Sequence, residues 1–430
     1  MKRLLFVLLV WPLLAHGQTL EECQQAAEQN YPLIRQYGLI EKMTELEVDN
    51  LDKGWLPQVS ATAQGSYQSD VMSWPDQMQS MMTQMGIDLK GLRKDQYRVG
   101  VDVSQMVYDG GTIKSHKELV RRKGEMQTAQ HEVTMYQIRQ RVNDLYFGIL
   151  LLKEQIQLNH DLQALLSSNE QKLASMFKRG TASESDYNLV KAERLSVVQQ
   201  ATSLESRKKA LTMMLSTFCG KSIDDIGVSL KEMANTSTMN LQGASVKCNR
   251  PELKLIMSQL NVADAQEKVL DASLLPKFSL FAQGYYGYPG YNMFDDMLRH
   301  QWSLNGIIGA RLSWNIGALY TRKNDLAKIR LQRETAETSR DAFLFNNQLE
   351  QIQQNEEIAH YRKLMADDAE IISLRSSVRK AAESKLSHGI IDASDLVKEI
   401  NSENAAKLQQ SIHEIQLLKA IYDLKNTTNN

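Results

Sequence analysis

The chain has 430 residues, of which 42% are hydrophobic and 23% are charged, a composition that argues against a disordered protein. Its 50 basic and 51 acidic residues leave a formal net charge of -1. Because this balance provides no overall basic field, the composition argues against a nucleic-acid partner.

The first 17 residues have the features of a secretory signal peptide. Lys2 and Arg3 form a basic start, an apolar run follows over 4–14, and residues 15–17 form a small-residue cleavage site. The run is shorter than the roughly 20 apolar residues that cross a bilayer, and no later stretch reaches that length. The sequence therefore predicts an exported protein without a helical membrane anchor.

Three cysteines lie beyond the expected signal peptide: Cys23, Cys219 and Cys248. An odd number fits no complete disulfide framework. Cys219 and Cys248 bracket an irregular stretch and could pair in an oxidising compartment, although spacing alone does not establish the geometry. For Cys23, in the first expected helix, we expect a buried apolar role.

The mature chain opens with a helix expected over 20–53. A period of two then replaces the helical period over 57–70 and again over 97–108, with apolar residues on one face and polar residues on the other. This alternation predicts two strands, each with one apolar and one wet face. A long loop over 71–95 separates them.

A very long helical hairpin follows, expected over 111–218. The chain has no proline between Pro75 and Pro251, and within this run a helical pattern over 111–178 stops near Gly180 before a second helix returns. At 1.5 Å per residue the first helix would be about 100 Å long. Such a length predicts an extended rod, a coiled coil or a spanning tube.

The second half of the chain repeats this plan. Strands are expected over 277–288 and 301–316, and a second helical hairpin over 317–425 reverses at Gly389. Leu275-Pro276 repeats the Leu-Pro pair that begins the first strand. Recurrence in helix, strand and turn alike indicates that one structural unit was duplicated.

We therefore expect three segments along the chain. The signal peptide occupies 1–17, the first repeat occupies 18–245 and the second repeat occupies 246–430. The first repeat is expected to close with an irregular equatorial segment over 219–245.

The four expected strands are typical of a transmembrane β-barrel, whose strands need about 9–11 residues with alternating apolar and polar positions. Four strands cannot close a barrel, and open edges would leave backbone groups unsatisfied in lipid. Several copies must then share one barrel. Two copies would give a filled interior and three a wider one with room for water, which the polar inner faces favour. Soluble hairpins packed on a core are the alternative.

Heptad spacing marks the returning helix of the first hairpin, where an apolar residue recurs at every seventh position: Val190, Val197, Leu204, Leu211 and Phe218. Heptads predict helices that supercoil side by side. Lys and Arg interrupt the stripes, which is typical of a helix that contacts neighbours on two sides, as in a tube wall. A free rod-like coiled coil is the alternative.

Motifs in both repeats match a known family. They lie at the start of the mature chain, at the first strand, at the turn into the long helix and at both helical reversals: Leu20-Glu21-Glu22, Asn30-Tyr31-Pro32, Leu56-Pro57, Tyr108-Asp109-Gly110-Gly111, 177–186 and 386–397. With these motifs the sequence resembles the TolC-like outer-membrane efflux proteins over almost the whole mature chain.

The resemblance implies a mainly α-helical fold with a membrane β-barrel. Each chain would supply four strands to a shared twelve-stranded barrel in a homotrimer, and an α-helical tunnel would continue into the periplasm. It also implies an outer-membrane location and passive transport of small molecules or polypeptides, as the exit duct of a tripartite efflux pump or a type I secretion system.

The implied partners are outer-membrane lipid, a periplasmic adaptor (membrane fusion) protein and an inner-membrane transporter of the RND, ABC or MFS type. The runner-up from another class is a secreted or surface-attached trimeric coiled-coil protein with a structural or adhesive role.

The gate candidates are Asp395, Asp186 and Asp392. In the family, acidic rings near the second tip narrow the periplasmic entrance, and Asp395 matches one such position, whereas Lys398 stands at the next. Clustered carboxylates in a narrow pore attract cations and repel anions. Helix capping is the alternative, because acidic residues are favoured in a first helical turn.

Gly180 and Gly389 suit the chain reversals, since glycine best tolerates a left-handed helix end. The resemblance adds adaptor docking at the same tips, for which the candidates are Arg179, Gly180, Thr181, His388, Gly389 and Ile390.

Aromatic residues flank the strands and suggest an interfacial girdle, with core packing as the alternative. The girdle candidates are Trp55, Trp302, Trp314, Tyr286 and Tyr288.

Four methionines fall on one helical face within the first long loop: Met78, Met81, Met82 and Met85. Thioethers bind Cu(I) and Ag(I), and some relatives export these ions. Apolar packing on the barrel rim is the favoured interpretation. The sequence contains no complete enzyme motif, so we expect neither enzymatic activity nor a cofactor.

Overall fold

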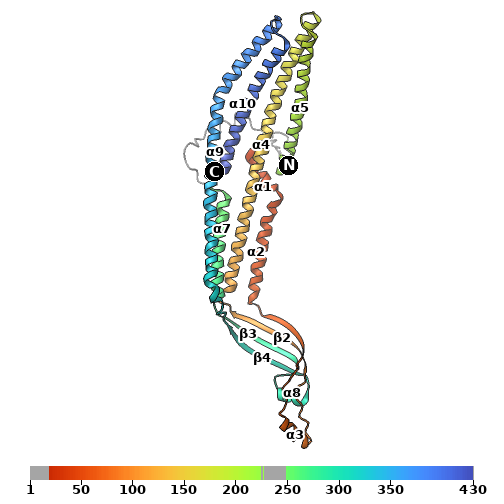
Figure 1. The fold of residues 1–430 in the computed structure, drawn as a ribbon, viewed down its shortest axis with the longest axis vertical. Helices are drawn as coiled ribbons and strands as arrows, with labels where there is room; N and C mark the ends of the chain where they lie inside the picture. Colours follow the sequence, from red (N-terminus) through yellow and green to blue (C-terminus); the bar gives the residue numbers. More distant parts are fainter. Residues whose placement is uncertain (1–18, 224–225, 227–247, 430) are drawn as a thin grey trace, which may run out of the picture. The chain divides into compact units, whose positions relative to one another are not determined.

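The computed structural model describes residues 19–223, 226 and 248–429, with the element order shown in Figure 1. The chain divides into two compact units, each built from segments far apart in sequence. Unit 1 contains the residues up to Tyr37 together with Ala129–Lys254 and Ser339–Asn430; unit 2 contains Gly38–Thr128 and Leu255–Thr338. The two longest helices, α4 (Thr112–Lys178) and α9 (Ala318–Ser387), contribute residues to both.

Unit 2 contains an antiparallel sheet with the strand order β1-β2-β3-β4. The strands are β1 (Gln58–Tyr67), β2 (Asp95–Tyr108), β3 (Lys277–Tyr288) and β4 (Ser303–Ser313). With 10, 14, 12 and 11 residues, each reaches the length of about 9–11 residues that a tilted strand needs to cross a bilayer. Pairing of β2 with β3 joins the two repeats into one sheet.

Paired helices form the rest of unit 2. In the first repeat α2 (Gln36–Asp52) packs on the beginning of α4, where Lys117 Nζ lies 2.6 Å from an oxygen of Asp52. In the second repeat α7 (Pro251–Ser273) packs on the beginning of α9, where Arg322 pairs with Asp271 at 3.1 Å. The duplicated sequence therefore builds two similar helix pairs.

Short helices lie in the loops at the far end of the sheet, α3 (Asp76–Gln84) between β1 and β2 and α8 (Met293–Arg299) between β3 and β4 (Figure 1). In the described part of the chain, no helix combines the length and apolar content needed to span a membrane.

The structure breaks the helix expected over 20–53 into two helices, α1 (Leu20–Asn30) and α2. Tyr31, at φ -62° and ψ 132°, is extended, and Pro32 begins a short 3-10 turn, η1 (Pro32–Arg35). A residue before proline is pushed out of the helical region by a clash with the proline ring, which accounts for the break. A second such turn, η2 (Lys53–Trp55), follows α2.

Unit 1 combines α1, α5 (Glu184–Cys219) and α10 (Ala393–Thr428) with the remaining parts of α4 and α9. One core cluster surrounds Tyr146, which is completely buried, and includes residues of α1, α4, α5 and α10. A second cluster lies near the helical reversals and joins Leu173 and Val190 of the first hairpin to Leu396 and Ile400 of the second.

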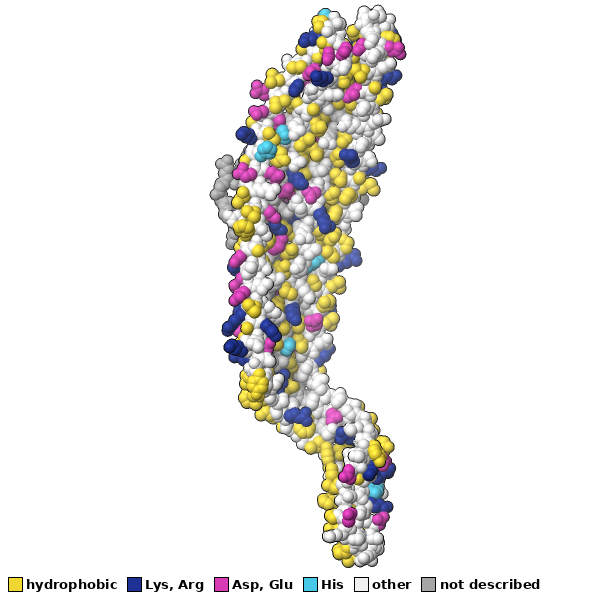
Figure 2. Space-filling model, in the orientation of Figure 1, with side chains coloured by type: hydrophobic (Ala, Val, Ile, Leu, Met, Phe, Trp, Pro, Cys, Tyr) yellow, Lys and Arg dark blue, Asp and Glu magenta, His cyan; other side chains and the backbone are white. Residues whose placement is uncertain are grey.

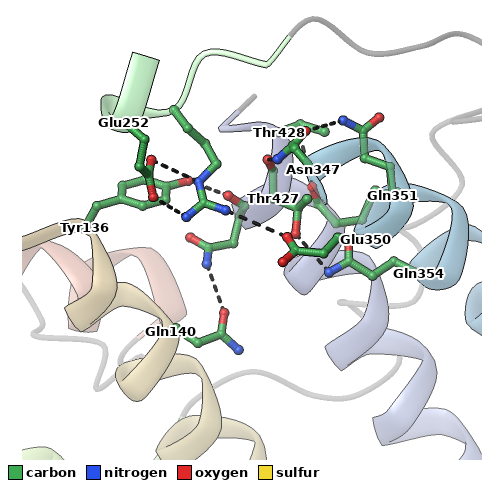
Figure 3. A network of polar contacts seen from close by, with 12 residues as sticks. Tyr136, Gln140, Glu252, Asn347, Glu350, Gln351, Gln354, Thr427 and Thr428 are labelled. Atoms are coloured by element: carbon green, nitrogen blue, oxygen red, sulfur yellow. Dashed lines mark hydrogen bonds and ion pairs between the residues drawn. The ribbon is translucent and has the colours of Figure 1, made fainter. Parts of the chain in front are cut away.

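The end of α10 is held in a polar network between α4 and α9 (Figure 3). Asn347 Nδ2 donates to the carbonyl of Thr427 at 2.7 Å, and Gln354 Nε2 donates to the Thr427 hydroxyl at 2.8 Å. Tyr136 of α4 donates its hydroxyl to the carbonyl of Asn426 at 2.6 Å. The last carbonyls of a helix have no partner within the helix, and these side chains supply one.

Gly124 allows the close approach of α4 to α2, which leads to a prediction. A Cβ added there would lie 2.4 Å from Thr44 Oγ1 and 3.0 Å from Thr44 Cγ2, whereas a Cβ at Gly38 of α2 would meet nothing within 4 Å. A helical Gly→Ala change normally stabilises by about 0.5–1 kcal/mol. We expect Gly38→Ala to raise the thermal unfolding temperature of the detergent-purified protein and Gly124→Ala to lower it. A rise in both variants would contradict the close packing.

Candidate functional site

The sheet of unit 2 has two chemically different faces. Directly paired residues share a face, and the register places Val101 between Ala61 of β1 and Gly284 of β3. It also pairs Ala282 with Ile308. The apolar positions of the four strands therefore form one continuous surface.

The opposite face of the sheet carries polar and charged side chains that contact one another across the strands. Arg98 Nε donates to Gln64 Oε1 at 3.0 Å, across the β1–β2 pair. On β3 and β4, the guanidinium of Arg311 lies 5.0 Å above the ring of Phe281. A surface with this chemistry is compatible with water.

The apolar face is left uncovered within one chain. Ile308 is 84% exposed, Leu304 83% and Val59 66%, and hydrophobic side chains lie on the visible surface of the sheet in Figure 2. Apolar patches of this kind on a folded protein mark a contact with lipid or with another protein. The outer edges of β1 and β4 have no neighbour in the four-stranded sheet, so they need partner strands as well.

Four of the five girdle candidates have exposed rings. Trp302 is 44% exposed, its ring lies 5.4 Å from that of Tyr286, and Trp55 and Trp314 are also exposed. Tyr288 has a different setting, because it is 3% exposed and its hydroxyl accepts a hydrogen bond from the Arg93 amide at 2.9 Å. It packs with Leu92 and Met297 in a small loop core. The girdle remains a prediction for the exposed residues.

Both helical reversals have the same backbone design. Gly180 has φ +76° and Gly389 has φ +70°, a left-handed conformation that strains other residues. The amides of Thr181 and Ile390 each donate back to a helix carbonyl, at 2.9 Å in both cases. These bonds, with those of the two glycine amides, form Schellman motifs that end α4 and α9.

The six docking candidates at these reversals have exposed side chains or backbone, and Ile390 is 70% exposed. An isoleucine so exposed at a tip suits a partner surface. Adaptor docking itself remains a prediction.

Asp186 connects the two hairpins. It completes a capping box with Ser183 at the start of α5, where its Oδ2 accepts from the Ser183 hydroxyl at 2.6 Å. Its Oδ1 accepts the backbone amide of Ala393, the first residue of α10, at 3.1 Å. The Ser183 hydroxyl is the main cause of a lowered pKa for this carboxyl.

The two acids of the second reversal have unequal settings. Asp392 caps α10 by accepting the Asp395 amide at 3.0 Å. Asp395 is exposed, and within the described residues its carboxylate has no hydrogen-bond partner. Capping therefore accounts for Asp186 and Asp392, whereas no contact among the described residues accounts for the Asp395 carboxylate.

A second hydrogen bond connects the hairpins further along the helices. Asn401 Nδ2 of α10 donates to Glu193 Oε1 of α5 at 2.9 Å. Toward the reversals, each hairpin therefore contacts the other through these two polar bonds and through the apolar cluster there.

A buried ion-pair network, which sequence reasoning missed, lies between α9 and α10. Arg379 pairs with Glu403 and, at 2.7 Å, with Glu383, while Lys407 lies 2.8 Å from Glu403. Burial opposes ionisation of Glu403, whose side chain is 4% exposed, but its bonds to Lys407 and Arg379 outweigh burial and lower its pKa. The only sequence signal is opposite charge four residues apart on each helix.

The methionine candidates lie on and just after α3. Met78, Met81 and Met85 are exposed and Met82 is half-buried. No group of three or more His, Cys, Asp or Glu side chains in the described residues is placed to hold a metal. Binding of a soft metal by the thioethers remains a hypothesis.

The comparisons with known proteins identify this arrangement. The model of the outer membrane efflux protein family matches residues 24–213. Within these residues the chain is similar to the outer membrane efflux proteins. It is therefore an outer-membrane channel protein whose helical part forms a periplasmic tunnel, and the secreted coiled-coil alternative is not supported.

Solved structures show the same fold along nearly the whole length. Similar structures include the outer membrane protein VceC from Vibrio cholerae (12% identity, 96% of each chain covered, TM-score 0.66). Another is the Campylobacter jejuni CmeC outer membrane channel (12% identity, 96% of this chain and 86% of that chain, TM-score 0.64). A third is the open state of the Neisseria gonorrhoeae MtrE outer membrane channel (13% identity, 96% and 89%, TM-score 0.63). A search of curated proteins finds no match.

These similarities confirm the predicted fold class, a mainly helical efflux-protein fold that adds its strands to a barrel. The division into two repeats at residue 245 remains a prediction, and most of the expected equatorial segment lies outside the described residues.

The bond from Asp186 to Ala393 gives a prediction about local stability. Asp186→Ala removes both the cap of α5 and the hydrogen bond to the Ala393 amide, which we expect to lower the stability of this region by about 1–2 kcal/mol. In hydrogen exchange, the amides of Ala393 and the first turn of α5 should exchange faster than in the wild type. Glu184→Gln, an exposed acid in the same turn, should leave both unchanged. Equal exchange rates of these amides in Asp186→Ala and Glu184→Gln would contradict a stabilising bond between Asp186 and Ala393.

The same bond has a defined pH dependence. The hydrogen bond from the Ser183 hydroxyl holds the pKa of Asp186 in the folded protein below the ordinary value of an aspartate. A depressed carboxyl stabilises the fold above its unfolded pKa and loses that contribution as pH falls through the folded pKa. The amide of Ala393 should therefore stay protected at neutral pH and lose protection only below about pH 4, with no such change in Asp186→Ala.

The buried network gives a third prediction. Arg379→Met leaves the buried Glu403 with Lys407 as its remaining cationic partner in the network, which we expect to destabilise the folded protein by less than the roughly 3–5 kcal/mol that a fully unpaired buried charge costs. Arg379→Met combined with Glu403→Gln removes the incompletely paired charge and should recover most of this loss in a thermal or denaturant unfolding assay. A double variant as unstable as the single one would show that packing, not charge, is responsible.

Proposed function

We propose that three copies of this chain form a passive exit duct for a tripartite efflux pump or a type I secretion system. The observation that carries the proposal is the sheet register, which lines up the apolar positions of all four strands on one face. A wall with one apolar and one polar face separates lipid from water. Similarity to the outer membrane efflux proteins over residues 24–213 supports the trimer and pump partnership in general terms.

We infer the number of copies from the need to close the β-barrel and from the width of its lumen. Two copies would bring eight strands, whose interior is filled by side chains, whereas three bring twelve and leave a wider lumen. Polar side chains such as Gln64 and Arg98 on the inner face suit the wider case. Each copy would complete the edge strands of its neighbours, so that no backbone group is left unsatisfied in lipid.

The helices also expose surfaces that neighbouring copies would cover. In the part of α9 that belongs to unit 1, Phe345 is 62% exposed, Leu349 50% and Ile352 54%. Their spacing of four and three residues places them on one side of the helix. Burying such a stripe against another helix is the usual way in which long helices associate.

Transport through this duct would require no chemistry from the chain. The sequence lacks a complete enzyme motif, and the proposed role needs neither a cofactor nor enzymatic activity. Selection of the substrate would lie with the inner-membrane transporter, of the RND, ABC or MFS type, because a wide polar lumen discriminates little.

The adaptor would dock on the two helical reversals, through Arg179, Gly180, Thr181, His388, Gly389 and Ile390. Support comes from the exposure of these residues and from the matched Schellman turns, which give both reversals the same backbone shape. A periplasmic adaptor with a repeated binding element fits two similar tips.

Asp395 is the gate residue that we favour. In a trimer its position would recur three times around one axis, and its exposed carboxylate is not engaged in capping. Asp186 and Asp392 are engaged in helix capping, so they would shape the entrance and contribute less charge to it.

The trimeric duct is tested by fractionation and mass. The protein should partition with detergent-extracted outer-membrane barrels and run as a heat-modifiable trimer, and it should form discrete channels in planar bilayers. A monomer in mild detergent, or absence from the outer-membrane fraction, would overturn the proposal.

The gate is tested by removing its charge. Asp395→Asn should weaken the preference of the channel for cations and raise single-channel conductance in planar bilayers, because three carboxylates no longer constrain the entrance. Asp367→Asn, an exposed acid on α9, should change neither quantity. Unchanged selectivity and conductance in Asp395→Asn would reject Asp395 as the gate.

A further inference from the structure

Two of the three cysteines lie together in the core of unit 1. Cys23 of α1 is 0% exposed, and Cys219, the last residue of α5, is 5% exposed. The Cys219 thiol donates to the carbonyl of Cys23 at 3.5 Å. Both residues belong to the cluster around Tyr146, although they are 196 positions apart in sequence.

The two thiols also interact with each other. The hydrogen bond between them, and then burial, raise the pKa of the Cys23 thiol, and the same bond lowers the pKa of the Cys219 thiol. The two side chains therefore face each other in the folded core.

Contacts without sulfur hold α1 against the end of α5. Asn30 Nδ2 donates to the carbonyls of Thr217 at 3.2 Å and Phe218 at 3.1 Å, and the rings of Tyr31 and Phe218 stack at 6.1 Å. A Cβ added to Gly220 would lie 2.4 Å from Asn30. The backbone around the cysteines is thus positioned by several independent interactions.

Cys248, the other partner considered for Cys219, adjoins a residue that is bonded to the end of α10. The amide of its neighbour Asn249 donates to Thr428 at the end of α10. Asn429 Nδ2 in turn donates to the carbonyl of Asn249 at 2.9 Å. This anchor adjoins the network of Figure 3, in which Arg250 binds Glu252.

We propose that Cys23 and Cys219 are joined by a disulfide in the exported protein, which covalently fastens α1 to the end of α5. All three cysteines are thiols in this structure, so the bond is an oxidation product of the arrangement seen here. An exported chain reaches an oxidising compartment, where such bonds form and persist.

The oxidation is a thiol–disulfide exchange with a periplasmic thiol oxidoreductase as oxidant. The thiolate of one of the two cysteines attacks one sulfur of the oxidoreductase disulfide and releases the other as a thiolate. The thiolate of the second cysteine then attacks the sulfur of the first and releases the second oxidoreductase thiolate. Two electrons pass to the oxidoreductase, and the two protons leave the cysteine thiols.

Burial determines when this exchange takes place. Both sulfurs lie within the closed core, out of reach of another protein, so the exchange precedes closure of the core around Tyr146. After closure the bond is equally out of reach of reductants. A bond that closes so long a loop restricts the unfolded chain strongly and therefore stabilises the fold.

The test is a two-reagent alkylation of the full-length protein extracted from outer membranes. Cells are lysed in denaturant with N-ethylmaleimide, and the protein is then reduced, treated with iodoacetamide and mapped by peptide mass. Cys23 and Cys219 should carry only the second reagent and Cys248 only the first. Maleimide on Cys23 and Cys219, or a Cys219–Cys248 linked peptide, would overturn the proposal.

Unfolding in the presence of reductant provides a second readout. Denaturant unfolding of the wild type should shift to lower concentration when a reductant is added to the unfolded protein before refolding. Cys23→Ala, Cys219→Ala and the double variant should lose this shift, while Cys248→Ala should retain it. A shift that survives in the double variant would contradict the bond.

Discussion

Satisfaction of backbone hydrogen bonds in lipid is the constraint on which this structure depends. Strands β1 and β4 each have one neighbour in the described sheet, and each leaves a row of donors and acceptors open. In water such an edge is tolerated, but in a bilayer each unsatisfied group costs several kcal/mol. Because the exposed side chains of Leu304 and Ile308 suit lipid, the sheet belongs in a bilayer and requires strands from other copies.

The helical part of the chain also exposes surfaces that are suited to contact with other copies. Stripes such as Phe345, Leu349 and Ile352 are exposed in one copy, and the interruptions by Lys and Arg prevent a simple two-helix seam. The polar interactions inside the chain have another role, because they fix how its own elements pack. Arg379 with Glu403 does this within the second hairpin, and Asn347 with Thr427 does it at the end of α10.

Local patterns in the sequence predict local structure well and distant contacts poorly. The strand periodicity over 277–288 matches β3, and the long Pro-free patterns match α4 and α9 within a residue or two. Pro32 indicates a helix break at Tyr31, but the helical periodicity on both sides favoured one continuous helix over 20–53. No local signal reveals that Cys219 packs on Cys23, that Asp186 accepts the amide of Ala393, or that Tyr288 is buried, because each depends on elements far apart in sequence.

The distribution of these contacts indicates where the helical part can move. Within the second hairpin, the side chains of Arg379 and Glu403 are largely buried, at 12% and 4% exposure. Separating α9 from α10 would therefore break this ion pair and leave a charge without its partner. Near the reversals, the polar contacts between the hairpins are the Asp186–Ala393 and Asn401–Glu193 hydrogen bonds, which are individually weak. Further along the helices, Tyr136 of α4 donates to the carbonyl of Asn426 of α10 at 2.6 Å, and Lys419 of α10 pairs with Asp144 of α4 at 2.8 Å. The apolar cluster near the reversals is held by non-directional packing. Displacing the reversal of one hairpin against the other would therefore cost less than separating α9 from α10, whereas the core around Tyr146 and the α4–α10 contacts keep the hairpins together further along.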